Sequence, residues 1–145
     1  VYGPREFYKN TTASTIIQFG HQILSGNNPK LFENSDQIFR DFIYVKDVIQ
    51  ANIKACSCSK SGVYNVGTGI KRSFQEVSDI LQKTFNTQYK TDYIENPYSG
   101  YQSDTCANIQ ETKQKLGFQP YWSLEKGILD YSDEILSIYE KNIKK

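Results

Sequence analysis

Apolar residues recur three and four positions apart in several stretches of the chain, and this spacing predicts amphipathic helices. Polar and turn-forming residues separate these stretches. The expected helices span residues 12–24, 45–56, 74–85 and 109–116, and a last helix begins at residue 124. The apolar positions of the last helix are Leu124, Ile128, Tyr131, Ile135, Ile138 and Tyr139.

Capping signals mark the ends of two of these helices. Ser73 and Glu76 form the capping-box pattern, so the third helix is expected to begin at residue 74. Gly117 is expected to end the fourth helix. The side of the second helix that should be buried carries Val48, Ile49, Ala51, Ile53 and Ala55.

Short segments that favour β structure lie between the helices. Residues 30–32, 39–43 and 91–94 are predicted strands, and residues 63–66 are predicted to form a compact buried strand between glycines. Residues 1–4 have the pattern of a strand end that enters a loop, because Pro4 cannot continue a ladder. Helices that alternate with strands predict an α/β fold.

The length of 145 residues suits one domain with one core, and no linker or repeat divides the chain. Acidic and basic residues are interspersed and the net charge is +1, so neither nucleic acid nor an anionic membrane is an expected partner. No apolar run approaches the roughly 20 residues that cross a bilayer. A small charged ligand fits this composition better.

Cys56, Cys58 and Cys106 suit neither a disulfide framework nor a zinc site, because their number is odd and one residue separates the first two. Reduced thiols in a cytoplasmic protein, without a bound metal, are therefore expected. The chain begins at Val1 and contains no methionine, so we also expect it to be part of a longer protein. No signal peptide is predicted.

Four motifs occur along the chain: VYGPRE at residues 1–6, RDFIYVKDV at 40–48, GVYNVGTG at 62–69 and LGFQP at 116–120. Together they resemble the C-terminal part of the extended short-chain dehydrogenase/reductases that act on nucleotide sugars. The resemblance runs from end to end. It implies a single substrate-binding region over residues 1–145, built from the substrate-binding lobe and the terminal elements of an NAD(P)-binding Rossmann-type fold.

Within that superfamily the sequence is most similar to the ADP-glyceromanno-heptose 6-epimerases, because Lys9 follows the PRE motif and precedes the pattern Thr-x-Ala-Ser. The resemblance implies an isomerase that oxidises C6″ of an ADP-linked heptose with NADP or NAD and returns the hydride to the other face of the carbonyl. The product would feed lipopolysaccharide core synthesis. The intact enzyme would be a homo-oligomer.

The resemblance assigns roles to individual residues. Lys9 matches the second acid/base residue beside the cofactor, where an ammonium could protonate or orient the oxygen at the reacting carbon. Val1 matches a strand end that contacts the nicotinamide through its backbone. Arg40 matches an arginine whose planar fork suits a pyrophosphate. Tyr101 matches a phenol that reaches the substrate.

Further positions match substrate contacts. Thr11 and Gln18 stand where the family more commonly has Ser and His. In the family, another segment lies along the nucleotide, where an aromatic face and backbone groups would suit adenine. The residues that match this segment are Phe32, Glu33, Asn34 and Ser35.

Structural interpretations remain for several polar residues. Lys9 alone could be a solvated loop lysine. Arg40 could instead pair with Asp41 or Asp47, and Tyr101 could be a half-buried loop aromatic.

Two carboxylates near an arginine suggest acid/base chemistry, but Asp41 and Asp47 are structural in the family, where they hold the junction of strand and helix. A Tyr44 hydroxyl with Asp47 would serve the same end. His21, the only histidine, is expected on the polar side of its helix and is assigned no catalytic role.

Two features of catalytic family members are missing from these residues, the Gly-rich turn GxxGxxG and the Tyr-x-x-x-Lys pair. The first lets the backbone approach a dinucleotide pyrophosphate, and the second supplies the principal acid/base group. We therefore expect the N-terminal dinucleotide-binding part, which would hold most of the cofactor, to lie outside this sequence. The chain alone is expected to be inactive.

Two other functions stay open. A UDP- or dTDP-sugar 4-epimerase or 4,6-dehydratase would share Arg40 and the architecture but would have no use for Lys9. Replacement of Lys9 would therefore separate these enzymes. A non-catalytic nucleotide-sugar-binding domain would keep the groove without redox chemistry.

Overall fold

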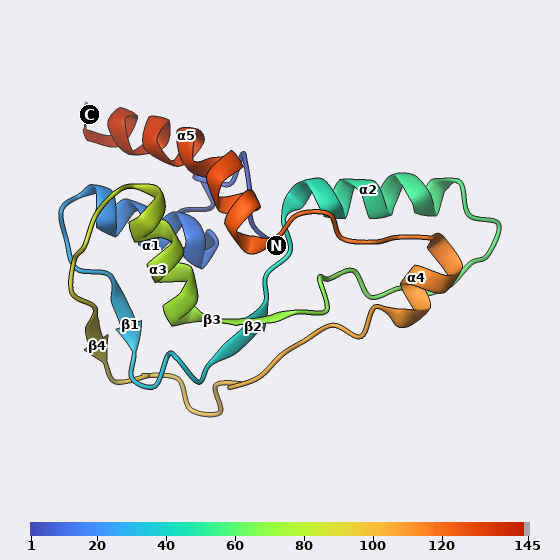
Figure 1. Cartoon of the computed structure of the whole chain (residues 1–145), viewed down its shortest axis with the longest axis horizontal. Coiled ribbons are helices and arrows are strands. Elements are labelled where there is room, and N and C mark those ends of the chain that lie inside the picture. The colour runs from blue at the N-terminus through green and yellow to red at the C-terminus, as the bar shows by residue number, and fades with distance from the viewer. Residues whose placement is uncertain (144–145) are drawn as a thin grey trace.

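The computed structural model of the chain describes residues 1–143, apart from the side chains of Phe7, Asn10, Thr11, Asn142 and Ile143. Helices alternate with short strands, which confirms the predicted α/β class (Figure 1). No helix within these residues is long and apolar enough to cross a membrane. The elements in chain order are the 3₁₀ helix η1 (Phe7–Thr12), α1 (Thr15–Leu24), β1 (Lys30–Phe32), β2 (Phe39–Asp41), α2 (Val45–Cys56), β3 (Lys71–Ser73), α3 (Phe74–Thr84), β4 (Asp92–Ile94), α4 (Gln110–Leu116) and α5 (Leu124–Ile143).

The described strands form two small sheets. β1 pairs in parallel with β4, in a register that places Leu31 opposite Tyr93. β2 pairs antiparallel with β3. An isolated bridge between Tyr2 and Tyr44 joins the N-terminal segment to the start of α2. The segment 33–38 therefore connects two strands that belong to different sheets, β1 and β2.

Helices α1, α3 and α5 pack against one another around the larger core (Figure 1). Four of the predicted apolar positions of α5 lie in this core and are at most 4% exposed: Leu124, Ile128, Tyr131 and Ile135. Gly20 lets α1 approach α5 closely, since a Cβ there would come within 2.9 Å of the Ile135 side chain. Burial of each large apolar side chain contributes about 1.5–3 kcal/mol to folding.

A second, smaller cluster joins α2 and α4 around Ile43, Ala51 and Phe118, on the right in Figure 1. The prediction that Ile49 and Ile53 are buried is wrong, because their side chains are 49% and 54% exposed. Only one side of α2 meets this cluster, so its other apolar residues face solvent. Ala55 is exposed as well.

Residues 63–66 do not form the predicted strand. A strand needs a neighbour for its N–H and C=O groups, and no described strand pairs with this segment. Val63 is 94% exposed as a result. The strand predicted for residues 39–43 ends at Asp41, and the carbonyl of Ile43 accepts instead from the Tyr2 N–H at 3.1 Å.

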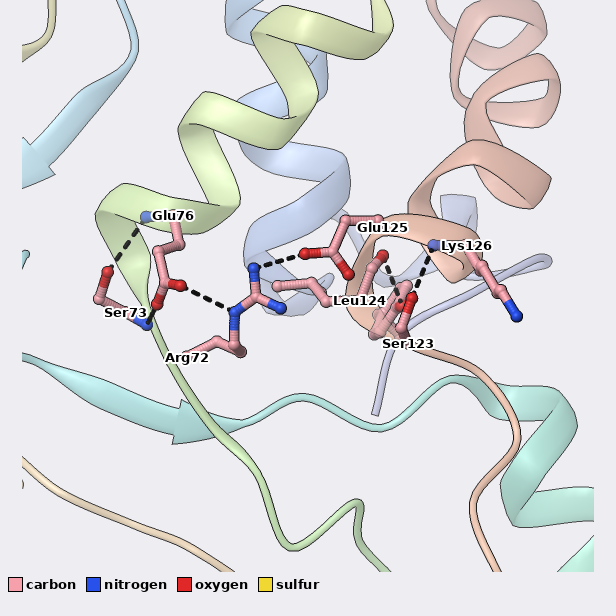
Figure 2. A network of polar contacts seen from close by, with 8 residues as sticks. Arg72, Ser73, Glu76, Ser123, Leu124, Glu125 and Lys126 are labelled. Carbon is pink, nitrogen blue, oxygen red and sulfur yellow. Dashed lines mark hydrogen bonds and ion pairs between the residues drawn. The ribbon is translucent and has the colours of Figure 1, made fainter.

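The predicted capping box is present at the start of α3. Ser73 Oγ accepts from the Glu76 N–H at 3.1 Å, and Glu76 Oε2 accepts from the Ser73 N–H at 2.6 Å. Arg72 extends this network by donating to Glu76 at 2.9 Å and to Glu125 at 2.6 Å (Figure 2). As predicted, Gly117 ends α4 in the left-handed conformation, with φ of 61°.

Candidate functional site

A pocket of about 340 Å³ lies between α1, β1, β4 and the start of α3. Its apolar wall consists of Phe19, Leu31, Phe32, Ile38, Phe74 and Ile94. Its polar groups come from Thr15, Gln18, Gln22, Lys30, Ser35 and Tyr101. Hollows elsewhere, near Cys58 and near Asn28, are lined mainly by polar side chains. An apolar pocket with a few converging polar groups is the usual form of a small-molecule site.

Three aromatic rings cluster beside this pocket. The Phe32 ring lies edge-on to Tyr101 at a centroid distance of 5.6 Å and to Tyr98 at 6.2 Å. The Tyr98 and Tyr101 rings are stacked 6.4 Å apart. Edge-on and offset-stacked pairs are the favoured arrangements of aromatic side chains. The 98–101 loop therefore packs against the end of β1.

Arg40, on β2, is held against the same cluster. Its Cζ lies 4.9 Å from the centroid of the Tyr101 ring and 5.6 Å from that of Phe74. Nη1 donates to the Phe39 carbonyl at 2.8 Å, and Nη2 donates to the Gln102 carbonyl at 2.6 Å. No carboxylate among the described residues forms an ion pair with Arg40, so its charge is oriented without being neutralised.

Ser35 contributes an unsatisfied hydroxyl to the pocket. The residue is 1% exposed, and its Oγ has no hydrogen-bond partner among the described residues. Its N–H donates to the Phe32 carbonyl at 3.1 Å. Asn34 adopts a left-handed conformation with φ of 58°, and the Glu33 N–H donates to Ile94 at 2.9 Å. This turn follows β1, and a buried hydroxyl without a partner is uncommon in folded proteins.

Five of the ten residues selected from the sequence gather around this pocket. Arg40 lies over the Tyr101 ring, which lines the pocket. The other four line the pocket themselves: Gln18, Phe32, Ser35 and Tyr101. Gln18 is on α1, and its Nε2 donates to the Ala13 carbonyl at 2.7 Å. Glu33 and Asn34 are exposed in the adjoining turn.

The other three lie outside this pocket. Lys9 is exposed on η1, where its N–H donates to the Glu6 carbonyl at 3.0 Å and its carbonyl accepts from Thr12 Oγ1 at 2.7 Å. Val1 is 72% exposed and precedes the Tyr2 bridge. Thr11 also belongs to η1, and its side chain is outside the described part of the chain.

Asp41 holds the turn at residues 67–69. Its Oδ1 accepts from the N–H and the hydroxyl of Thr68 at 2.8 and 2.5 Å. Its Oδ2 accepts from the N–H groups of Gly69 and Ala107 at 2.9 and 3.2 Å. These contacts are structural. Among the described residues, Asp41 therefore forms no ion pair with Arg40, the residue before it in the sequence.

Asp47 is 1% exposed at the start of α2. Its two oxygens accept from the N–H groups of Tyr121 and Trp122, each at 3.0 Å. The interpretation that pairs Asp47 with the Tyr44 hydroxyl is wrong, because that hydroxyl donates to Asp130 at 2.6 Å. Asp47 thus fastens the extended connection before α5 to α2.

His21 is half-buried, although it was expected on the polar side of its helix. Its ring lies 6.3 Å from that of Tyr139 on α5, and Nε2 is buried without a hydrogen-bond partner among the described residues. Burial lowers the pKa of His21. No contact with the pocket described above supports a chemical role.

Some pocket residues carry no signal in the sequence. Ile38, Phe74, Thr15 and Gln22 reach the pocket only because β2 pairs with β3 and α1 packs on α3. The sequence predicts Phe74 as the first helical residue after the N-cap Ser73, but it gives no indication of what the Phe74 ring faces. The described side chains contain no group of three or more His, Cys, Asp and Glu that could hold a metal ion.

Residues 1–67 match the NAD dependent epimerase/dehydratase family. Over 94% of its length the chain is 42% identical to the ADP-L-glycero-D-manno-heptose-6-epimerase of Helicobacter pylori, with a TM-score of 0.84. It is 28% identical to the UDP-N-acetylglucosamine 4-epimerase of Methanobrevibacter ruminantium, solved with UDP-N-acetylmuramic acid, over 94% of its length with a TM-score of 0.83.

A UDP-glucose 4-epimerase from Thermotoga maritima shares the fold alone, at 23% identity over 100% of this chain and a TM-score of 0.82. The chain spans only 41% of the Helicobacter protein, 43% of the Methanobrevibacter protein and 44% of the Thermotoga protein. The α/β architecture is therefore that of part of a Rossmann-like epimerase fold. The chain is thus similar to nucleotide-sugar epimerases over most of its length, and its residues 1–67 match the NAD dependent epimerase/dehydratase family.

Proposed function

We propose that residues 1–145 are the C-terminal substrate-binding region of a nucleotide-sugar epimerase whose N-terminal dinucleotide-binding part lies outside this sequence. We propose further that the intact protein is an ADP-glyceromanno-heptose 6-epimerase. The observation that carries the proposal is one pocket with an aromatic wall, beside which Arg40 is oriented. Within the described part of the chain, the Ser35 hydroxyl in this pocket has no hydrogen-bond partner and Arg40 has no ion pair. The 42% identity to the Helicobacter enzyme favours the heptose substrate.

The nucleotide would occupy the pocket beside β1. Adenine has two apolar faces and a polar edge, which suits the Phe32 ring together with the hydroxyl of Ser35. A ligand that bonds to Ser35 Oγ would satisfy a group that the described protein leaves unpaired. The left-handed turn at Asn34 presents backbone groups next to this position.

The pyrophosphate would lie against Arg40. A guanidinium has five N–H donors, and the structure accounts for one bond from Nη1 and one from Nη2. The remaining donors can bind phosphate oxygens, and the two carbonyl contacts hold the fork in a fixed plane. The hydroxyl of Tyr101 would reach the phosphates or the sugar from the ring stacked against Arg40.

Lys9 would serve as the acid/base residue at the sugar. Its side chain is exposed on η1. Exposure is required of a group that contacts a substrate and a cofactor held by another part of the protein. A lysine ammonium can protonate or orient the oxygen at the carbon that changes configuration. Thr11 and Gln18 would make further contacts with the substrate.

The residues present do not suffice to hold a dinucleotide. They include no Gly-rich phosphate turn, so NADP or NAD would be bound mainly by the N-terminal part, with the Val1 backbone and Lys9 at its nicotinamide end. When bound, the cofactor would supply reversible hydride transfer at C6″. The proposed activity implies a cytoplasmic homo-oligomer that serves lipopolysaccharide core synthesis, and an isolated chain without activity.

A UDP-sugar 4-epimerase is the second candidate, favoured by the 28% identity to the Methanobrevibacter enzyme. Calorimetric titration of the chain with ADP, ADP-mannose and UDP-glucose separates the two. We expect ADP and ADP-mannose to bind more tightly than UDP-glucose. The Arg40→Ala variant should lose this binding, and Lys83→Ala, which removes an exposed charge from α3, should keep it.

Tighter binding of UDP-glucose would contradict the heptose proposal, as would unchanged binding in the Arg40→Ala variant. If the chain alone binds none of the ligands, the same titrations are made on the protein that includes the N-terminal part. A Lys9→Ala variant of that protein should lose most of its 6-epimerase activity and keep a measurable remainder, whereas a 4-epimerase should tolerate the change.

A further inference from the structure

A buried carboxylate holds both ends of the segment that carries Lys9. Glu6 is only 3% exposed. Its Oε1 accepts from the Gly3 N–H at 3.3 Å and from Ser14 Oγ at 2.7 Å, and its Oε2 accepts from the Ser14 N–H at 2.7 Å. Gly3 and Ser14 lie on either side of η1. One side chain therefore closes residues 3–14 into a loop.

The backbone of Glu6 contacts Lys9 as well. The Lys9 N–H donates to the Glu6 carbonyl at 3.0 Å, in the first turn of η1. A 3₁₀ helix of six residues has weak hydrogen-bond geometry and little stability of its own. Its position must therefore be set by contacts at its ends, and the Glu6 carboxylate provides three of them.

The segment before η1 has an unusual backbone that needs such support. Gly3 has φ of 142° and Arg5 has φ of 72°, a left-handed conformation that side chains other than glycine rarely adopt. The Arg5 N–H donates to Glu134 of α5 at 2.5 Å. Backbone of this kind persists only where surrounding contacts determine it, and it concentrates at functional sites.

A charge at this position is costly for the protein. Among the described residues no lysine or arginine side chain forms an ion pair with Glu6, so hydrogen bonds are the direct contacts that compensate its burial. Tyr131 lies in the core nearby, and its burial, followed by the charge of Glu6, raises the pKa of the Tyr131 phenol. A neutral residue would avoid this cost but could not accept from three donors in two directions.

We infer that Glu6 is the positioning residue for Lys9: by tying Gly3 to Ser14 it fixes η1 and thereby aims the Lys9 side chain at the reacting carbon. This inference rests on the role proposed for Lys9. It goes beyond that role because Glu6 faces inward and acts only through the segment it closes. If the Glu6 carboxylate only stabilised the fold, its replacement would lower kcat by the same factor with or without Lys9.

The test is a double-mutant cycle in the full-length enzyme, comparing Glu6→Gln, Lys9→Ala and the double variant. Glutamine keeps the size of the side chain but has only one acceptor oxygen. We expect Glu6→Gln to lower kcat about tenfold with little change in KM, as for a misplaced catalytic group. In the Lys9→Ala background the same substitution should lower kcat by less than about twofold. Glu111→Gln, which removes an exposed carboxylate of α4, is the matched control.

An independent readout uses trypsin, which cleaves after lysine. In the Glu6→Gln variant, cleavage after Lys9 should be several times faster, while cleavage after Lys83 on α3 should be unchanged. If this variant does not fold, Ser14→Ala replaces it, because that change removes only the 2.7 Å bond from Ser14 Oγ. It should give a smaller fall in kcat that is again absent without Lys9.

An equal loss of kcat in both backgrounds would overturn the inference and leave Glu6 as a residue of the fold. An unchanged kcat in Glu6→Gln, with Lys9→Ala inactive, would also overturn it while the proposed role of Lys9 stands. A fully active Lys9→Ala variant would refute that role first, and the inference with it. These failures are therefore distinguishable.

Discussion

Nη2 of Arg72 donates to Oε1 of Glu125 at 2.6 Å, and this ion pair joins the start of α3 to the start of α5 (Figure 2). The same guanidinium donates through Nε to the capping residue Glu76. Two helices that are distant in sequence are thus linked at their N-termini, where negative charge is favourable. Phe74, the first residue of α3, lines the pocket.

Replacement of Arg72 should weaken this link. Arg72→Gln removes both ion pairs, and because Glu76 and Glu125 are partly exposed we expect the free energy of unfolding to fall by about 1 kcal/mol. Urea denaturation measures the change, and Lys83→Gln on the exposed face of α3 should show almost none.

The same variant gives a second readout of this link in acid. The hydrogen bond from Arg72 lowers the pKa of Glu125 below its ordinary value of 4.5. A carboxyl group with a lowered pKa stabilises the fold above the ordinary value, and this contribution is lost as the pH falls through the lowered one. Arg72→Gln should therefore lose less stability than the unmodified chain on acidification below about pH 4.5.

His21 should produce a separate pH dependence. Burial lowers its pKa below the ordinary 6.5, so the unfolded chain binds a proton at a higher pH than the folded chain does. Above pH 6.5 His21 is neutral in both states and does not reduce the free energy of unfolding. This free energy falls as the pH decreases through the window between the two pKa values. His21→Gln should flatten this decline in thermal denaturation between about pH 7 and pH 5. An unaltered profile would mean that His21 is readily protonated in the folded chain.

Asp47 should be among the most sensitive positions. Asp47→Ala leaves the N–H groups of Tyr121 and Trp122 without their acceptor, and we expect a loss of about 3 kcal/mol for two unpaired donors. Asp47→Asn keeps one acceptor oxygen and should lose less. Trp122 is the only tryptophan and reports on the change by its fluorescence. Asp133→Ala on the exposed surface of α5 is the control.

The helices could be predicted from the sequence because their signals are local. Apolar spacing and the Ser73 cap fix α3 within one residue, and the periodicity of α5 identifies its buried face. The strand expected at residues 63–66 could not be judged in this way, since a strand exists only with a partner. The exposure of Ile49 depends likewise on what covers α2.

The candidate site likewise has features that the sequence indicates and features that only the fold determines. Resemblance selected Phe32 and Ser35 from one segment and Arg40 and Tyr101 from two others, and the fold gathers them around one pocket, although their roles remain predictions. No pattern in the sequence could show that Ser35 would be buried without a partner. That property results from the tertiary arrangement around the pocket and from the turn after β1, in which the Ser35 N–H donates to the Phe32 carbonyl.

Tyr101 should affect nucleotide binding through its ring. Tyr101→Ala removes the surface that lies 4.9 Å from Arg40 Cζ and 5.6 Å from the Phe32 ring, and we expect ADP affinity to fall about tenfold. Tyr101→Phe keeps the ring but loses the hydroxyl proposed to reach the phosphates or the sugar, so it should weaken ADP binding less than Tyr101→Ala does. Tyr121→Ala removes an exposed ring that does not line the pocket and should have no effect. Calorimetry distinguishes these outcomes.

Ser35 should separate stability from binding. Its hydroxyl is buried and has no hydrogen-bond partner in the described part of the chain, so Ser35→Ala removes an unsatisfied polar group and should raise the free energy of unfolding by about 1 kcal/mol. The same change removes the group that we expect to bond to the nucleotide, so ADP affinity should fall several-fold. Ser78 provides the control, because its hydroxyl is also buried without a partner among the described residues but does not line the pocket. Ser78→Ala should therefore raise stability and leave affinity unchanged. Equal affinity in the two variants would show that the Ser35 hydroxyl does not contact the ligand.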